Sequence, residues 1–197
     1  MAIMMDIIFA SFMGGIITFI TINANIVIRQ TWASYNSELM VQRMLVSTAQ
    51  VVEVELRNMG CGVDIGAQTI DEARDTCVSF KMAKRPEYNS PIVNVKYYSG
   101  STSELTGTEN PRDRFLYRQE GAAAPERTGM VTQFSLKYMD EFGEVLLPTP
   151  VADLDRIKII EITIEVQSPF AALLDPEKRY TSALWKQTRL ASQNLKR

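Results

Sequence analysis

The chain has 197 residues, of which 46% are hydrophobic and 22% are charged, and its formal net charge is −2. This composition is typical of a folded domain with or without an appendage. The slightly acidic balance argues against a nucleic-acid-binding protein, which would need a basic face. Histidine is absent and only two cysteines occur, which excludes His-based triads, His-ligated metals, Cys-only zinc sites and iron–sulfur clusters. These exclusions favour a structural or interaction protein over an enzyme.

The first segment, residues 1–28, is dominated by an uncharged run. Between Asp6 and Arg29 the sequence reads IIFASFMGGIITFITINANIVI, which is long enough to cross a bilayer as a helix. A signal peptide would need a basic stretch before the run and a cleavage site after it, but no Lys or Arg precedes Arg29. We therefore predict a helix that is inserted in a membrane or buried in a filament. A signal peptide and a buried core helix are the alternatives.

Three polar side chains in this segment are candidates for contacts between subunits. Asp6 lies near the helix start, where the helix dipole favours a carboxylate, and an ionised Asp in hydrocarbon is costly unless it is paired. Asn23 and Asn25 are also costly there unless they face another helix. One interpretation is that Asp6 pairs with the amino terminus of a neighbouring subunit. The other is that Asp6 lies among lipid headgroups and needs no partner.

The helix is predicted to continue through residues 29–60 as an amphipathic second half. Neither Gly nor Pro occurs there before Gly60, and glycine suits the end of a helix. Trp32 and Tyr35 follow the apolar run at a level where aromatic rings favour a membrane interface. Apolar residues at three- and four-residue spacing form one stripe that must pack against something: Val41, Leu45, Ala49, Val52, Leu56 and Met59.

Residues 61–197 are predicted to form an antiparallel β-sheet domain with exposed loops. Alternating or β-prone composition marks strands at residues 76–82, 92–98, 114–118, 130–139, 144–147, 157–167 and 180–190. The stretches 99–110 and 120–129 are predicted as exposed loops, because they are rich in Gly, Ser, Thr, Ala and Glu. The predicted fold class is α+β, with a long N-terminal helix packed by its C-terminal half on an antiparallel sheet.

The two cysteines, Cys61 and Cys77, lie at the predicted helix end and in the first predicted strand. In an exported protein they are candidates for a disulfide, and otherwise they would be two buried free thiols. The loop between them carries four acidic residues: Asp64, Asp71, Glu72 and Asp75. Their spacing does not match an EF-hand, so a solvated loop is the favoured interpretation and calcium the weaker one. No phosphate-binding glycine loop or nucleophile elbow occurs, and we expect no cofactor, metal or small-molecule substrate.

The order of these elements resembles the type IV pilin superfamily, in particular W-type minor pilins and J-type minor pseudopilins. Residues 52–60, VEVELRNMG, resemble the family's E-x-D-L-R-N-A-G run at the end of the long helix. Residues 131–143 are similar to the family's strand that ends in a Y-x-D-x-x-G turn. Residues 155–166 resemble the apolar strand that follows, and residues 183–197 resemble the last strand and its basic tail. The resemblance covers nearly the whole chain.

The start of the chain departs from this family. Its members are made with a basic leader that ends in Gly, and they carry a Glu at mature position five. Here Asp6 takes that position if Ala2 is the first residue, and Met5 takes it if Met1 is the first residue. Either a leader is missing from the sequence or the protein is inserted without that processing.

The resemblance implies a non-catalytic minor subunit of a type IV pilus, of a type II secretion-like filament, or of the tip of such a filament. Its helix would anchor it in the inner membrane and assemble with other pilin-like subunits. Its sheet domain would be periplasmic or extracellular. Two alternatives are a major subunit of the filament shaft and a single-span accessory subunit of a stable membrane protein complex.

Overall fold

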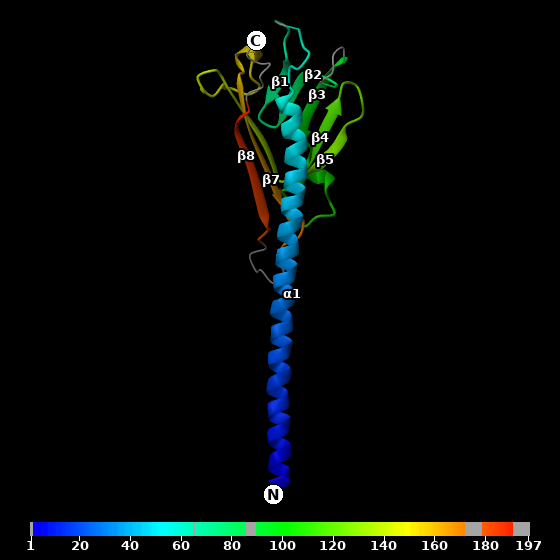
Figure 1. The fold of residues 1–197 in the computed structure, drawn as a ribbon, viewed down its shortest axis with the longest axis vertical. Helices are drawn as coiled ribbons and strands as arrows, with labels where there is room; N and C mark the ends of the chain where they lie inside the picture. The colour runs from blue at the N-terminus through cyan, green and yellow to red at the C-terminus, as the bar shows by residue number, and fades with distance from the viewer. Residues whose placement is uncertain (1, 65, 86–89, 172–178, 191–197) are drawn as a thin grey trace.

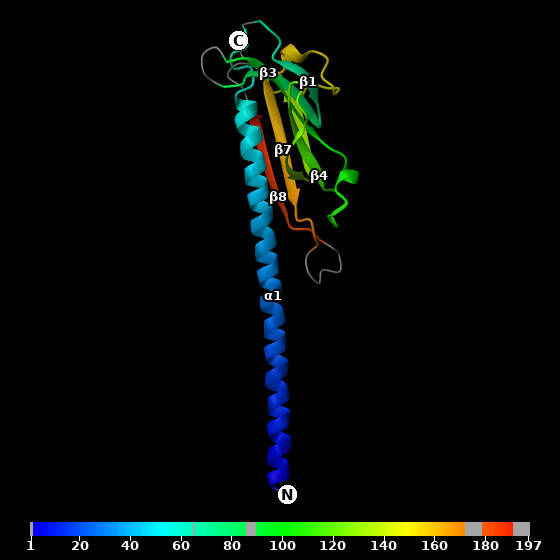
Figure 2. The same cartoon turned by 90° about the vertical axis from the view of Figure 1, so that its right-hand side faces the viewer.

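The long helix is the first element of the computed structural model, which describes residues 2–64, 66–85, 90–171 and 179–190. This helix, α1 (Ala2–Arg57), has 56 residues and is therefore about 84 Å long. Its first half extends away from the strands and its second half runs along them (Figures 1 and 2). The predicted α+β class is confirmed, although the helix ends three residues before Gly60.

The strands in the described part of the chain form two antiparallel sheets. The first sheet has the order β1-β2-β3-β4-β5, with bounds Ile70–Arg74, Cys77–Ala83, Ile92–Ser99, Arg114–Glu120 and Glu126–Val131. The second has the order β6-β7-β8, with bounds Gln133–Met139, Ile159–Gln167 and Ser182–Leu190. Two short 3₁₀ helices, Thr102–Glu104 and Leu154–Arg156, lie in the connections.

The division into two sheets arises at Thr132, inside the single strand predicted over residues 130–139. Its backbone N–H donates to the carbonyl of Glu165 at 2.8 Å, and its hydroxyl donates to the same oxygen at 3.2 Å. Val131 is buried at the end of β5, and the next buried apolar residue is Phe134 on β6. Side chains of one continuous strand return to the same face every two residues, but the two buried residues here are three positions apart. This break in the alternation marks the place where the chain leaves one sheet and enters the other.

Three local predictions are wrong. The acidic stretch before Cys77, predicted as a solvated loop, contains the edge strand β1, which buries Ile70 and Ala73 against the core. The loop predicted over residues 120–129 contains the start of β5. The return strand predicted over residues 144–147 is reduced to one bridge, between Met139 and Val145. In each case the local composition is polar or short, and pairing with a neighbouring strand decides the outcome.

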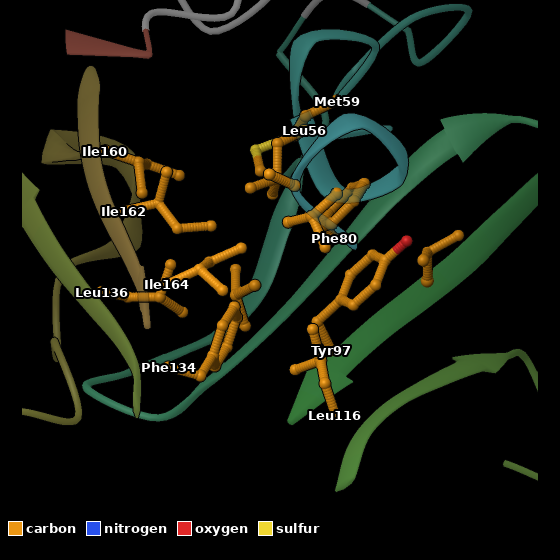
Figure 3. Packing of buried hydrophobic residues seen from close by; sticks show 14 of the residues in the cluster. Leu56, Met59, Phe80, Tyr97, Leu116, Phe134, Leu136, Ile160, Ile162 and Ile164 are labelled. Carbon is orange, nitrogen blue, oxygen red and sulfur yellow. The ribbon is translucent and has the colours of Figure 1, made fainter. Parts of the chain in front are cut away.

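The core lies where the second half of α1 packs between the two sheets. In Figure 3, Leu56 of α1 and Met59 of the turn after it lie above a layer formed by β7 isoleucines on one side and Phe80 and Tyr97 on the other. Every residue of the predicted apolar stripe is 8% exposed or less, which confirms the predicted buried face: Val41, Leu45, Ala49, Val52, Leu56 and Met59.

The Y-x-D-x-x-G motif forms a compact turn after β6. The Tyr138 hydroxyl is buried and donates to the backbone carbonyl of Arg74 at 2.8 Å. The Asp140 carboxylate accepts the backbone N–H groups of Phe142 at 3.0 Å and Glu144 at 2.9 Å. Gly143 has φ +85°, a left-handed conformation that favours glycine. The motif therefore ties β6 to the first sheet and reverses the chain. The basic tail beyond residue 190 lies outside the described residues.

Candidate functional site

The first half of α1 is a continuous apolar surface that the rest of the described chain does not cover. Every described side chain from Ile3 to Arg29 is exposed. The helix is long and apolar enough to cross a membrane, and none of its most apolar window is buried. This contradicts the alternative that the segment is a core helix of the fold. Such a surface requires lipid or other protein around it.

The polar side chains within this half are largely satisfied by the helix itself. The amide nitrogen of Asn23 donates to the Phe19 carbonyl at 3.1 Å, and that of Asn25 donates to the Thr21 carbonyl at 3.0 Å. Two threonine hydroxyls make the same i−4 contact at 2.8 Å, from Thr18 to Gly14 and from Thr21 to Ile17. These bonds lower the cost of placing the groups in lipid. Because of these hydrogen bonds, Asn23 and Asn25 depend less on a facing helix than we expected from the sequence.

The three predicted assembly residues do not share one face of the helix. At 100° per residue, Asn23 and Asn25 lie about 160° apart, and Asp6 lies about 100° from each. Asp6 is exposed, and the nearest basic side chain along the sequence is Arg29, about 35 Å away along the helix axis. A partner for the Asp6 carboxylate must therefore come from outside the described helix. One neighbouring helix cannot contact all three residues at once.

A charged joint holds the second half of α1 to the first sheet. The Glu55 carboxylate accepts the Tyr97 hydroxyl of β3 at 2.5 Å and the Arg118 Nε of β4 at 2.9 Å. Side-chain exposure is 19% for Glu55 and 21% for Arg118. Burial and the hydrogen bond to Glu55 raise the pKa of Tyr97 far above its ordinary value. The hydrogen bond to Glu55 also raises the pKa of Arg118. The Glu55 joint thus fixes the helix relative to the sheet.

The predicted Cys61–Cys77 disulfide is contradicted, because both cysteines are free thiols. The Cys61 carbonyl accepts the backbone N–H of Ala83 at the end of β2, whereas Cys77 begins that strand. Ala83 is six positions after Cys77 along β2, which corresponds to about 20 Å. A disulfide requires Cα atoms within about 7 Å. The sequence spacing gave no indication that the strand would carry the two thiols apart.

The acidic residues between the cysteines are divided among separate contacts. Glu72 pairs with Arg74 at 2.6 Å and with Lys96 at 2.7 Å, and the Lys96 hydrogen bond lowers the pKa of Glu72. Asp71 pairs with Lys81 at 3.0 Å. The backbone carbonyls of Asp64 and Asp75 accept N–H groups of the chain. Within the described residues, no group of three or more metal-ligating side chains converges, so the weaker calcium interpretation has no geometric support.

Comparisons with protein-family models, with curated proteins and with solved structures find no match. Function must therefore be inferred from the uncovered helix and from its attachment to the sheets. Sequence reasoning missed the Glu55 joint, although one signal was present. Glu55 lies three residues after Val52, at the flank of the apolar stripe, where a carboxylate needs a partner on the facing sheet.

Proposed function

We propose that the protein is a non-catalytic, pilin-like minor subunit that assembles through the first half of α1 into a type IV pilus, a type II secretion-like filament or a filament tip. The observation that carries the proposal is the unequal covering of one continuous helix. From Ile3 to Arg29 no side chain of α1 is covered by the described chain, whereas the stripe of α1 from Val41 to Leu56 is buried by the two sheets. The sheets therefore leave the apolar half free for lipid or for other helices.

Transfer of this half from lipid to a filament core is nearly neutral in hydrophobic free energy, because both surroundings are apolar. Direction and register must then come from helix packing and from polar groups. Asn23 and Asn25 are partly satisfied by their own helix, whereas Asp6 has no basic residue near it in the sequence. Asp6 is the group that gains most from a partner cation, such as the amino terminus of an adjoining subunit.

The two sheets, together called the β-domain, would move with the helix. The Glu55 joint and the buried stripe connect α1 to both sheets, so displacement of the helix along its axis carries the whole β-domain with it. This coupling suits a subunit whose helix enters a bundle while its domain stays at the surface. It requires no chemistry, and the protein would act through assembly alone.

The proposal is tested by comparing wild type, Asp6→Ala and Asp6→Glu in the native membrane. Asp6→Ala is expected to insert normally but to co-purify with less pilin-like partner, because the pairing that sets axial register is lost. Asp6→Glu keeps the carboxylate and is expected to retain much of the partner. Thr18→Val is the matched control, since the Thr18 hydroxyl is already bonded to its own helix. Wild-type recovery of partner by Asp6→Ala would remove Asp6 from the assembly surface. Co-purification with a stable complex that lacks pilin-like subunits would contradict the proposed function.

A further inference from the structure

A pocket of about 250 Å³ opens between α1 and the segment that follows β7, at the end of the β-domain nearest the N-terminus. Its walls include Ala33 and Met40 of the helix and Pro169 and Phe170 of the segment after β7. Phe170 lines the pocket and is nevertheless 59% exposed. The ring and the pocket beside it together form one mostly apolar surface that the described chain leaves open to its surroundings.

Helix geometry places this pocket close to the end of the apolar run. Residues 7–28 span about 33 Å, which fills the hydrocarbon core of a bilayer of about 30 Å. Ala33, the first helix residue of the pocket, lies five residues after Ile28, or about 7.5 Å further along the axis. The headgroup layer on each side of the core is about 5–7 Å deep. Ala33, at the membrane end of the pocket, therefore lies at the outer edge of that layer when α1 spans a membrane.

The side chains around this level suit a phospholipid surface. Trp32 and Tyr35 are exposed on the same stretch of helix, and aromatic rings of this kind concentrate at membrane interfaces. Arg29 is exposed directly after the apolar run, where a long cationic side chain can reach lipid phosphates. No acidic residue occurs between Asp6 and Glu38, so the helix presents no like charge to those phosphates. The pocket is thus continuous with the anchor and compatible with its lipid surroundings.

We propose that Phe170 and the pocket beside it form a second membrane contact, in which the Phe170 ring enters the headgroup layer and the pocket receives part of a phospholipid. This inference rests on the proposed function, because it requires α1 to span a membrane. The contact would set the tilt and rotation of the β-domain above the bilayer. It would be broken when the subunit leaves the membrane, so it would retain the free subunit until assembly.

The test uses single-tryptophan forms of the full chain in phosphatidylcholine–phosphatidylglycerol vesicles with brominated acyl chains. Trp32→Phe and Trp185→Phe give the background, and one tryptophan is then placed by Phe170→Trp, Phe12→Trp or Phe142→Trp. Position 12 lies in the apolar run. Position 142 is 84% exposed on the turn after β6, at the opposite end of the domain, and is the matched control. Bromine close to the headgroups is expected to lower fluorescence at position 170 about twofold and to leave position 142 unchanged.

The outcomes separate this inference from the proposed function. Quenching at position 12 with no more quenching at position 170 than at position 142 would overturn the lipid contact and leave the anchor intact. No quenching at position 12 would overturn the anchor and the lipid contact together. A blue shift at position 170 without bromine quenching would identify protein as the occupant and overturn the lipid contact. If Trp185→Phe fails to fold, a photo-crosslinking residue at position 170 in the native background gives the same decision through the presence or absence of phospholipid adducts.

Discussion

Gly129 of β5 lies directly against Thr48 of α1. A β-carbon at Gly129 would overlap the Thr48 hydroxyl oxygen and lie 3.3 Å from both the Cβ and the Cγ2 of that residue. Thr48 is only 3% exposed, so its side chain has little room to move away. The closeness of helix and strand at this point therefore depends on the missing side chain of Gly129.

Gly129→Ala is expected to destabilise the fold by about 1–3 kcal/mol, because the added methyl group forces α1 away from β5. The measurement is urea unfolding of the full chain in detergent, followed by circular dichroism. Gly107→Ala is the control, since no atom lies near a β-carbon there. Thr48→Ala combined with Gly129→Ala should recover part of the loss. A Gly129→Ala protein as stable as Gly107→Ala would contradict the close packing.

Glu55→Ala removes the carboxylate of the Glu55 joint and is expected to lower the free energy of unfolding by about 2–3 kcal/mol. The partly buried Arg118 and the fully buried Tyr97 both lose a charged hydrogen-bond partner. Glu53→Ala is a matched control on the same turn of helix. Glu53 pairs with the exposed Arg57, and such a pair contributes about 0.3–0.5 kcal/mol. Equal losses in the two variants would show that the joint does not hold the helix to the sheet.

The thiols should both be alkylated without reductant, and they should differ in reactivity. Burial, with the nearby Glu72 carboxylate, raises the pKa of Cys77 from 9.0 to about 11. In a Cys61→Ser protein, the alkylation rate at Cys77 should therefore rise with pH up to about 11. By linkage, the unfolded chain releases this proton at a lower pH than the folded chain, so this contribution to stability falls between pH 9 and 11. Detection by mass spectrometry of two peptides linked by a Cys61–Cys77 disulfide would contradict the separation of the two thiols along β2.

Deletion of residues 1–28 is expected to give a soluble, folded monomer. The deleted residues bury nothing against the β-domain, whereas the stripe from Val41 to Met59 that completes the core is retained. Circular dichroism and size-exclusion chromatography without detergent measure the outcome, with the full chain in detergent as the reference. Aggregation or loss of β-structure in the shortened protein would show that the two halves of α1 are not independent.

The sequence was sufficient to predict the helix and its buried face because both depend on local periodicity. Residues such as Val41, Leu45 and Leu56 recur at helical spacing, and that spacing alone places them on one side. The β7 strand was predicted for the corresponding reason, since Ile160, Ile162 and Ile164 alternate with a period of two. Where the periodicity of apolar residues and the final packing agree over a long segment, the element and its buried face can be predicted from a single sequence.

The remaining features depend on contacts between distant segments. The hydrogen bond from Arg118 to Glu55 joins residues 63 positions apart, and nothing in either neighbourhood selects the other residue. The edge strand β1 has few apolar residues and forms because β2 pairs with it. Phe170 and α1 line the same pocket only because β7 ends beside the helix. Such features follow from strand order and register, which a single sequence specifies weakly.

The most direct test of the central claim is photo-crosslinking from the apolar half of α1 in the native membrane. A crosslinking residue replaces Phe12, which is exposed on the bare helix, and the same residue replaces Phe142 as the comparison. Assembly through the helix predicts that position 12 forms adducts with the apolar N-terminal helices of pilin-like subunits and that position 142 does not. Adducts from position 12 to lipid alone, or to proteins without such a helix, would contradict the claim.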